Sequence, residues 1–188
     1  MKLPVTTRFI EKGSGKRMEG LIRIATEHDL LLWTGWRYRP SDEDRTWDWW
    51  SLYLECKASN GRYECYAAFM ANDLQGLAVL DLKPRRTRFG RAIALDYLAT
   101  NPANRHPNYG FKHVGVALVA VAVARSLESG AEGSIWLESL VGAANFYESL
   151  AMAKQPHRSI EGNLVYILEP AIAEQLLEEI KARGIVDL

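Results

Sequence analysis

The chain has 188 residues, the length of one domain, and a globular chain of this size buries about two-thirds of its unfolded surface. Lysine plus arginine and aspartate plus glutamate each number 23, so the composition gives no overall positive field that would argue for nucleic acid. No apolar run reaches the ~18 residues that cross a bilayer, and the N-terminus lacks the order of a signal peptide. We therefore expect a single domain over residues 1–188, in the cytoplasm and without a membrane partner.

The two cysteines, Cys56 and Cys65, do not form a C-x-x-C pattern and have no histidine cluster nearby. We expect two buried thiols rather than a redox or zinc pair. His28 and His157 also lack partners at the spacing of metal ligands, so we expect no metal.

The first third of the chain predicts a hairpin followed by two helices. The hairpin strands are Val5–Ile10 and Leu21–Thr26, which flank a turn rich in glycine and lysine. A short helix is predicted over Glu27–Trp36. A longer one is predicted to begin after Pro40, with acidic residues in its first turn, and to end near Ala58. Two adjacent apolar stripes run along the longer helix: Trp47, Trp50 and Leu54, and Trp49, Tyr53 and Cys56.

The next segment predicts three antiparallel strands. They are Tyr63–Met70, Leu74–Leu82 and Ala92–Leu98, and the first two are separated by a tight turn. Before the third strand we expect a short basic connection, which is either a solvated loop or a contact with an acidic partner. This connection contains Arg85, Arg86, Arg88 and Arg91.

The segment from Tyr109 to Gly130 is the most apolar in the chain and predicts a helix buried on most sides. The helix should begin between Lys112 and Gly115 and end at Gly130, a typical C′ glycine. Its first N–H groups would be unpaired and would attract an anion such as a phosphate. The segment has neither the Gly-Lys-Ser/Thr ending of a P-loop nor a G-x-G-x-x-G motif, which disfavours nucleoside triphosphates and dinucleotides.

The last third predicts a strand at Gly133–Leu140, a short helix at Gly142–Leu150 and a hairpin of Lys154–Ile160 and Leu164–Glu169. A terminal helix, Ala171–Ala182, follows Pro170. This order of elements predicts an α+β domain with a mixed sheet.

Four segments in this order resemble the GNAT superfamily of acyl-CoA-dependent N-acetyltransferases. They are Leu98–Pro102, Lys112–Leu118, Leu137–Leu140 and Ala143–Glu148, and the resemblance extends from about Ala92 to Leu168. It implies a mostly antiparallel sheet whose two central parallel strands splay apart, flanked by helices, with a further helix at the C-terminus. Acetyl-CoA would bind in the opening between those strands.

The segment before and at the start of the long apolar helix, which corresponds to the family's pyrophosphate loop, departs from the family's sequence. The family usually has arginine or glutamine, two residues, glycine, one residue, and glycine or alanine. Here Gly110 replaces the first residue and His113 the first glycine, while Gly115 matches. A histidine would crowd a phosphate that approaches closely, so weaker or repositioned CoA binding is expected. Arg105, His106 and Lys112 are candidates to supply the missing cationic contacts, as are the four arginines named above for the CoA 3′-phosphate.

The resemblance implies these roles by position. A backbone N–H on the first splayed strand would stabilise the oxyanion, the helix start would bind the pyrophosphate, and an asparagine would bind the pantetheine unless it caps its own helix instead. The implied CoA-binding residues are Leu98, Ala99, Thr100, Lys112, His113, Val114, Gly115, Val116 and Asn145.

Tyr147 matches the position at which the family often has its general acid. A phenol remains protonated at neutral pH and can donate a proton. The alternative is that the ring of Tyr147 only packs in the core. Glu138 and Asp96 are the candidates for the general base, since each alternates with apolar neighbours and faces either the acceptor groove or solvent. His106 is a third candidate, in a loop.

We expect an enzyme that transfers an acetyl group from acetyl-CoA to a primary amine by direct attack. One alternative is a CoA-binding or assembly module with little catalysis, and another is an acetyltransferase for an amine on a protein or an RNA. A small-molecule or protein amine is the expected acceptor, nucleic acid is less expected, and the terminal helix could pair two copies. Aromatic side chains would line the acceptor pocket or else fill the core; they are Trp33, Trp36, Trp47, Trp49 and Trp50.

Overall fold

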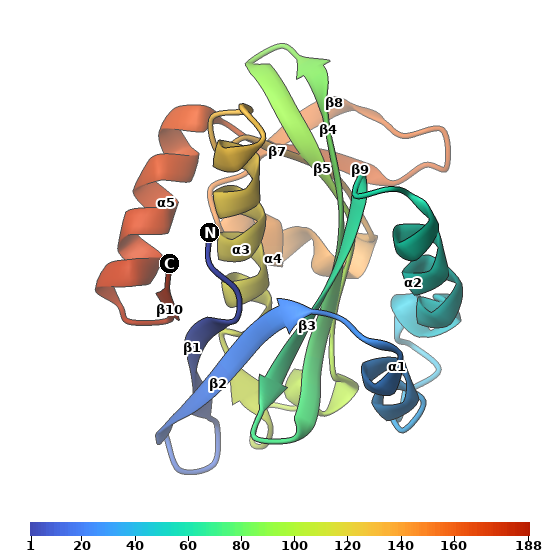
Figure 1. The fold of residues 1–188 in the computed structure, drawn as a ribbon, viewed down its shortest axis with the longest axis vertical. Helices are drawn as coiled ribbons and strands as arrows, with labels where there is room; N and C mark the ends of the chain where they lie inside the picture. The colour runs from blue at the N-terminus through green and yellow to red at the C-terminus, as the bar shows by residue number, and fades with distance from the viewer.

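The computed structural model describes all residues, 1–188, as one ten-stranded sheet with helices on both faces (Figure 1). The strand order is β10-β1-β2-β3-β4-β5-β7-β9-β8, and β6 pairs with β1 alone. The strands are β1 (Val5–Glu11), β2 (Arg17–Ile24), β3 (Tyr63–Met70), β4 (Asp73–Thr87), β5 (Gly90–Thr100), β6 (Phe111–Lys112), β7 (Ile135–Ser139), β8 (Ala153–Arg158), β9 (Leu164–Leu168) and β10 (Val186–Asp187).

Helices α3 and α5 cover one face of the sheet, and α1 and α2 cover the other (Figure 1). Each helix layer encloses a separate hydrophobic cluster against the sheet. None of the helices has the length and apolarity that a membrane crossing requires. The helices are α1 (Glu27–Trp33), α2 (Trp49–Ala58), α3 (Val114–Glu128), α4 (Ala144–Ser149) and α5 (Pro170–Ala182), and the 3₁₀ turns are η1 (Glu43–Thr46), η2 (Pro102–Arg105) and η3 (Val141–Ala143).

The sheet is antiparallel except where β5 meets β7. These two parallel strands pair only at Ile93 with Ile135 and at Ala94 with Trp136, and beyond that point they diverge. The expected mixed sheet with a splayed central pair is thus confirmed.

The helix predicted from Pro40 to Ala58 is wrong in its first half. That half forms η1 and an extended stretch, and α2 begins only at Trp49. Asp48 caps α2 by accepting hydrogen bonds from the backbone N–H groups of Trp50 and Ser51. The acidic residues before it bind arginine side chains instead of starting a helix.

Only one of the two apolar stripes predicted on that helix is buried. Its members are Trp49, Tyr53 and Cys56, which pack against the sheet. Trp50 and Leu54 are exposed instead, at 37% and 48% of their surface.

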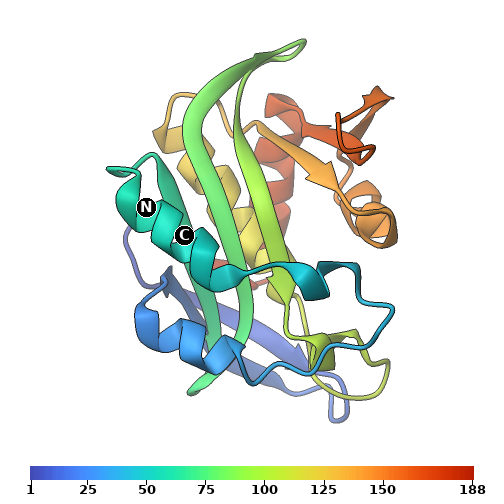
Figure 2. The ribbon, with the colours of Figure 1, turned by 90° about the vertical axis from the view of Figure 1, so that its right-hand side faces the viewer.

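The predicted basic connection is not a loop. β4 continues to Thr87 and β5 begins at Gly90, so the arginines lie on a long hairpin that projects beyond the rest of the sheet (Figure 2). Arg85 lies across the Trp136 ring, 5.1 Å from its centroid, and pairs with Asp81. These contacts help to keep the chain extended where the composition predicted a short basic loop.

The two cysteines are free and buried, as expected. Burial raises the pKa of the Cys56 thiol to about 11 and raises that of Cys65 as well. Both groups are therefore protonated at neutral pH and have the inert character of core thiols.

Candidate active site

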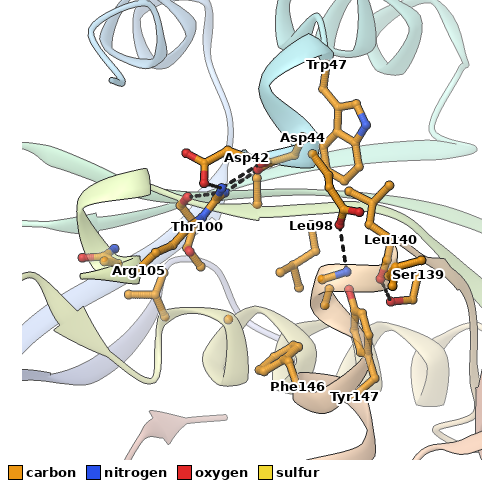
Figure 3. A pocket seen from close by; sticks show the side chains of 18 of the residues that line it. Asp42, Asp44, Trp47, Leu98, Thr100, Arg105, Ser139, Leu140, Phe146 and Tyr147 are labelled. Atoms are coloured by element: carbon orange, nitrogen blue, oxygen red, sulfur yellow. Dashed lines mark hydrogen bonds and ion pairs between the residues drawn. The ribbon is translucent and has the colours of Figure 1, made fainter. Parts of the chain in front are cut away.

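A cleft of about 820 Å³ lies at the opening between β5 and β7 (Figure 3). Its walls come from β5, the start of α3, the end of β7, the η3–α4 segment and the η1 segment. In Figure 3, Leu98 and Thr100 of β5 lie opposite Ser139 and Leu140, and Tyr147 rises from α4 between them. The divergence of two strands therefore creates a large cavity, as in many binding sites at sheet openings.

Asp96 enters the cleft because of a β-bulge. Leu95 lies opposite Leu80 and Tyr97 opposite Val79, so Asp96 is the extra residue between them. Its carboxylate has neither an ion pair nor a hydrogen bond within the protein. Burial, assisted by the charges of Asp81 and Glu138, raises its pKa to about 6, although two arginines oppose the rise. A half-buried carboxylate of this basicity is suited to accepting a proton.

The β5 backbone presents polar groups to the same opening. Asn101 N–H donates to Gln75 O at 2.8 Å, and by strand alternation the N–H of Leu98 faces away from β4, toward the cleft. The carbonyl of Thr100, which alternation also directs away from β4, accepts from Arg105 at 3.3 Å. The edge of β5 therefore offers an N–H donor where β7 no longer pairs with it.

Tyr147 is 6% exposed, and its ring packs against Phe146 and Tyr166. Burial raises its pKa above the ordinary value, so the phenol is protonated at neutral pH. Its hydroxyl points up into the cleft, near Ser139 and Leu140 (Figure 3). The ring thus contributes to the core and its O–H remains available as a donor to the cleft.

The start of α3 faces the other end of the cleft and has no side-chain cap. The first helical hydrogen bond runs from Ala117 N–H to His113 O. The N–H groups of Val114, Gly115 and Val116 therefore lack helical partners, and the first turn contains no acidic residue. Lys112 is exposed beside them. This arrangement can bind a phosphate group.

The structure shows how the chain accommodates both departures from the pyrophosphate loop. His113 has φ 74°, the left-handed conformation that glycine adopts most easily, and its ring contacts Arg183 with 3.4 Å between Nε2 and Nη2. Its Nδ1 is buried without a hydrogen-bond partner, and burial lowers its pKa, assisted by Arg183, Lys112 and Arg17. Gly110 has φ 81°, and a Cβ there would lie 2.6 Å from Asn104 Oδ1, so the bend excludes a longer side chain.

Arg105 anchors η1 above the cleft. Its guanidinium contacts Asp42 at 3.1 Å and Asp44 at 2.8 Å, and both carboxylates are only 5% exposed. Across the opening, Glu43 Oε2 accepts from Gly142 N–H at 2.8 Å. This hydrogen bond joins η1 to η3, on opposite sides of the cleft (Figure 3).

Most of the residues expected from sequence line this cleft, and a few do not. Asn145 lies on the exposed side of α4, outside the lining, and the cap of α4 is Ala143. The side chain of Val116 is also outside, and His106 stacks on Tyr109 away from the cleft. The residues brought together are Asp96, Leu98, Ala99, Thr100, Lys112, His113, Val114, Gly115, Glu138 and Tyr147.

The contribution of η1 to the cleft was not predicted from the sequence. Glu43, Asp42 and Asp44 looked like the first turn of a helix, and only the pairing with Arg105, about sixty positions away, places them at the cleft. A run of three acidic residues that each bind a specific partner cannot be distinguished by composition from a helix start.

No family model matches the sequence, and no curated protein matches it. Solved structures match the fold. A protein from Desulfovibrio desulfuricans assigned to the GNAT acetyltransferases is 20% identical, with TM-score 0.57, over 80% of this chain and 99% of its own. The toxin AtaT, bound to the C-terminus of the antitoxin AtaR and to acetyl-CoA, is 19% identical, with TM-score 0.58, over 85% of this chain and 98% of its own.

FdhC, described as a nucleotide-linked sugar GNAT, is 12% identical, with TM-score 0.60, over 95% of this chain and 98% of its own. The chain therefore has the fold of the GNAT acetyltransferases.

Proposed function

We propose that the protein transfers the acetyl group of acetyl-CoA to a primary amine. The observation that carries the proposal is the cleft itself, which combines an uncapped helix start, a free strand edge, a basic carboxylate and a phenol. Similar folds bind acetyl-CoA, as AtaT does.

The residues present fit acetyl-CoA. The N–H groups at the start of α3 and Lys112 would hold the pyrophosphate, and the gap between β5 and β7 would hold the pantetheine arm. Acetyl-CoA supplies an activated acyl group as a thioester. Arg105 is already paired with Asp42 and Asp44, so Lys112 is the better candidate for a phosphate contact.

Two side chains carry out the proton transfers of the proposed reaction, and one backbone N–H stabilises the charge that develops. Asp96, with Glu138 beside it, accepts the proton that the amine loses as its nitrogen forms a bond to the acetyl carbon. The N–H of Leu98 donates to the carbonyl oxygen as charge develops on it. Tyr147 donates its proton to the departing sulfur as the carbon–sulfur bond breaks. The products are an N-acetylated amine and free CoA.

Replacing Tyr147 with phenylalanine tests the proposal. We expect turnover to fall by about 10²–10⁴-fold, because one acid–base group is lost, while the affinity for CoA changes little. Tyr166→Phe is the matched control, since it also removes a buried hydroxyl, one that donates to Glu148 outside the cleft. Equal effects of the two variants, or none, would count against the proposal.

The non-catalytic alternative is distinguished by titration. If the native protein binds acetyl-CoA but acetylates no amine, a CoA-binding module is the better description. His113 and Gly110 motivate this alternative, since both depart from the family's loop.

An amine on a macromolecule is the second candidate acceptor. It is favoured by the exposed arginines on the β4–β5 hairpin, which form a basic strip beside β8. One similar fold is the toxin AtaT, bound to the C-terminus of its antitoxin AtaR, and another is found in a KacTA–DNA complex. Steep loss of RNA binding with added salt, and its weakening in Arg86→Ala and Arg88→Ala, would support this candidate.

A further inference from the structure

A second cavity, of about 610 Å³, lies on the α2 side of the sheet and borders the cleft. We call it the acidic cavity; the cleft and this cavity share four lining residues, so the two spaces meet there. The shared residues are Trp47, Asp96, Glu138 and Leu140. A molecule in the acidic cavity therefore lies against Asp96 and Glu138, the carboxylates proposed above as proton acceptors.

Four carboxylates from four different elements line the acidic cavity. Glu55 comes from α2, Asp96 from β5, Glu138 from β7 and Glu161 from the β8–β9 turn. None of the four takes part in an ion pair. The cavity thus concentrates negative charge that no ion pair within the protein neutralises.

The one cation in the lining, Arg85, is already committed. Its guanidinium pairs with the buried carboxylate of Asp81 at 3.1 Å and lies over Trp136. Asp81 also binds Arg62 at 2.7 Å. Arg85 is therefore shared between Asp81 and the cavity: its charge also opposes the rise of the Asp96 pKa, so it offsets part of the negative charge of the four carboxylates and leaves an excess of negative charge.

The carboxylates are spread along the cavity rather than gathered at one point. No three acidic, histidine or cysteine side chains approach closely enough to hold a metal ion. Asp96 and Glu138 lie at the junction, whereas Glu55 and Glu161 line the acidic cavity alone. Their charges, with that of Asp96, raise the pKa of Tyr97, although burial is the larger cause. An occupant with positive charges at two separated points matches this spacing.

Aromatic side chains line the same cavity. They can pack against a methylene chain and attract ammonium groups through their ring faces. Trp47 and Tyr97 meet edge to face, with centroids 5.1 Å apart, next to the junction. The aromatic members are Trp47, Tyr63, Tyr97 and Trp136.

We propose that the acceptor is an aliphatic diamine or polyamine, whose reacting amine lies at Asp96 and Glu138 while a second ammonium lies between Glu55 and Glu161. The proposal rests on the acetyl transfer proposed above. It adds that the acceptor has at least two positive charges, separated by a methylene chain.

The test compares 1,4-diaminobutane, spermidine and butylamine as acceptors. The native protein should favour the first two by about five- to thirtyfold in kcat/KM, the factor that corresponds to one or two additional ion pairs of up to ~1 kcal/mol each at a partly exposed site. The double variant Glu55→Gln, Glu161→Gln should lose most of this preference through a raised KM. The matched control is Glu174→Gln, Glu179→Gln, which removes two exposed charges from α5 on the opposite face and should retain the preference.

Equal use of butylamine and the diamines by the native protein would overturn the proposal, as would an equal loss in the control. If butylamine and the diamines alike are not acetylated although acetyl-CoA binds, the proposed function fails, and calorimetric titration of spermidine still decides the inference. Binding that the Glu55 and Glu161 variant weakens would support it, and equal or absent binding would overturn it. Acetylation of an RNA-linked amine alone would also overturn it.

Discussion

At the scale of single residues, His113 shows how a departure from a family motif can be compatible with the backbone the motif needs. Its φ of 74° is the conformation that a glycine would adopt, so the turn into α3 is retained at some cost in strain. The unpartnered Nδ1 adds a second small cost. The expected crowding of a phosphate thus depends on whether the ring stays beside Arg183.

Comparing His113→Gly with His113→Ala separates the backbone from the imidazole. Both variants lose the ring, but only alanine must keep a Cβ at positive φ, so it should be less stable than the glycine variant by about 1 kcal/mol. Urea denaturation measures this difference. If acetyl-CoA binds equally to both variants and to the native protein, the imidazole is not a ligand contact; tighter binding by both variants would show that it obstructs the site.

Asp96 should determine the acid limb of the pH profile. A base that must be unprotonated makes kcat/KM rise as the pH passes through about 6, the pKa of Asp96. Asp96→Asn should lower kcat/KM by about 10²–10⁴-fold and abolish this limb. A limb near pH 6 that persists in Asp96→Asn would assign it to another group, and Glu138→Gln is the variant to examine next.

The carboxylate of Asp96 should lower the free energy of unfolding as the pH rises, whereas it raises kcat/KM over the same range. Its folded pKa is raised from 3.8 to about 6, so its contribution to stability is complete below pH 3.8 and is lost as the pH rises through 6. At pH 8 Asp96→Asn should therefore be more stable than the native protein, by at most about 3 kcal/mol and by less where solvent reaches the group. Urea midpoints at pH 4 and pH 8 measure the change; a gain that is equal at both would contradict the assignment.

At the scale of elements, η1 depends on one arginine. Arg105→Ala leaves Asp42 and Asp44 buried without their main cationic partner, which should destabilise the protein by about 3–5 kcal/mol. Arg39→Ala is the control, because Arg39 also pairs with Asp42 but is 58% exposed, and its loss should cost about 1 kcal/mol or less. Chemical denaturation of both variants checks this, and similar losses would show that η1 is not anchored through Arg105.

The sequence correctly predicted the elements that are defined by hydrophobic periodicity and by glycine or proline residues at their ends. β3 was predicted with its observed ends, and α3 ends where Gly130 adopts φ 71°. The predictions failed where side chains distant in sequence decide the backbone. η1 follows from the pairing with Arg105, and the long β4–β5 hairpin keeps Arg85 over Trp136, so neither could be read from local composition.

The same distinction applies to the candidate site. The backbone positions at Leu98 and at the start of α3 follow from where strands and helices end, so a motif can locate them. The bulge that turns Asp96 into the cleft depends on the register with β4, and the union of two cavities at Trp47 depends on how α2 packs. Asn145 is exposed on α4 and outside the cleft lining, because helix phase, which a motif does not fix, directs it to solvent; its predicted contact with pantetheine stays a prediction.

At the scale of the whole molecule, β1 connects both ends of the chain to the proposed phosphate site. It pairs with β2, with β10 and with β6, and β6 contains Lys112 directly before α3. Ile185 and Val186 in and beside β10 are 2% and 4% exposed and belong to the larger hydrophobic cluster. The C-terminal residues thus support the strand against which the start of α3 is held.

Deleting residues 184–188 should therefore affect both stability and CoA binding. Loss of two buried aliphatic side chains should lower the free energy of unfolding by roughly 3–5 kcal/mol. The released β1 should also hold β6 less firmly, so that acetyl-CoA binds more weakly. Asp187→Ala, at an exposed position of the same strand, is the control and should change neither property. Urea denaturation and calorimetric titration measure the two effects, and a deletion that lowers stability but leaves affinity intact would show that β6 and Lys112 are positioned without β1.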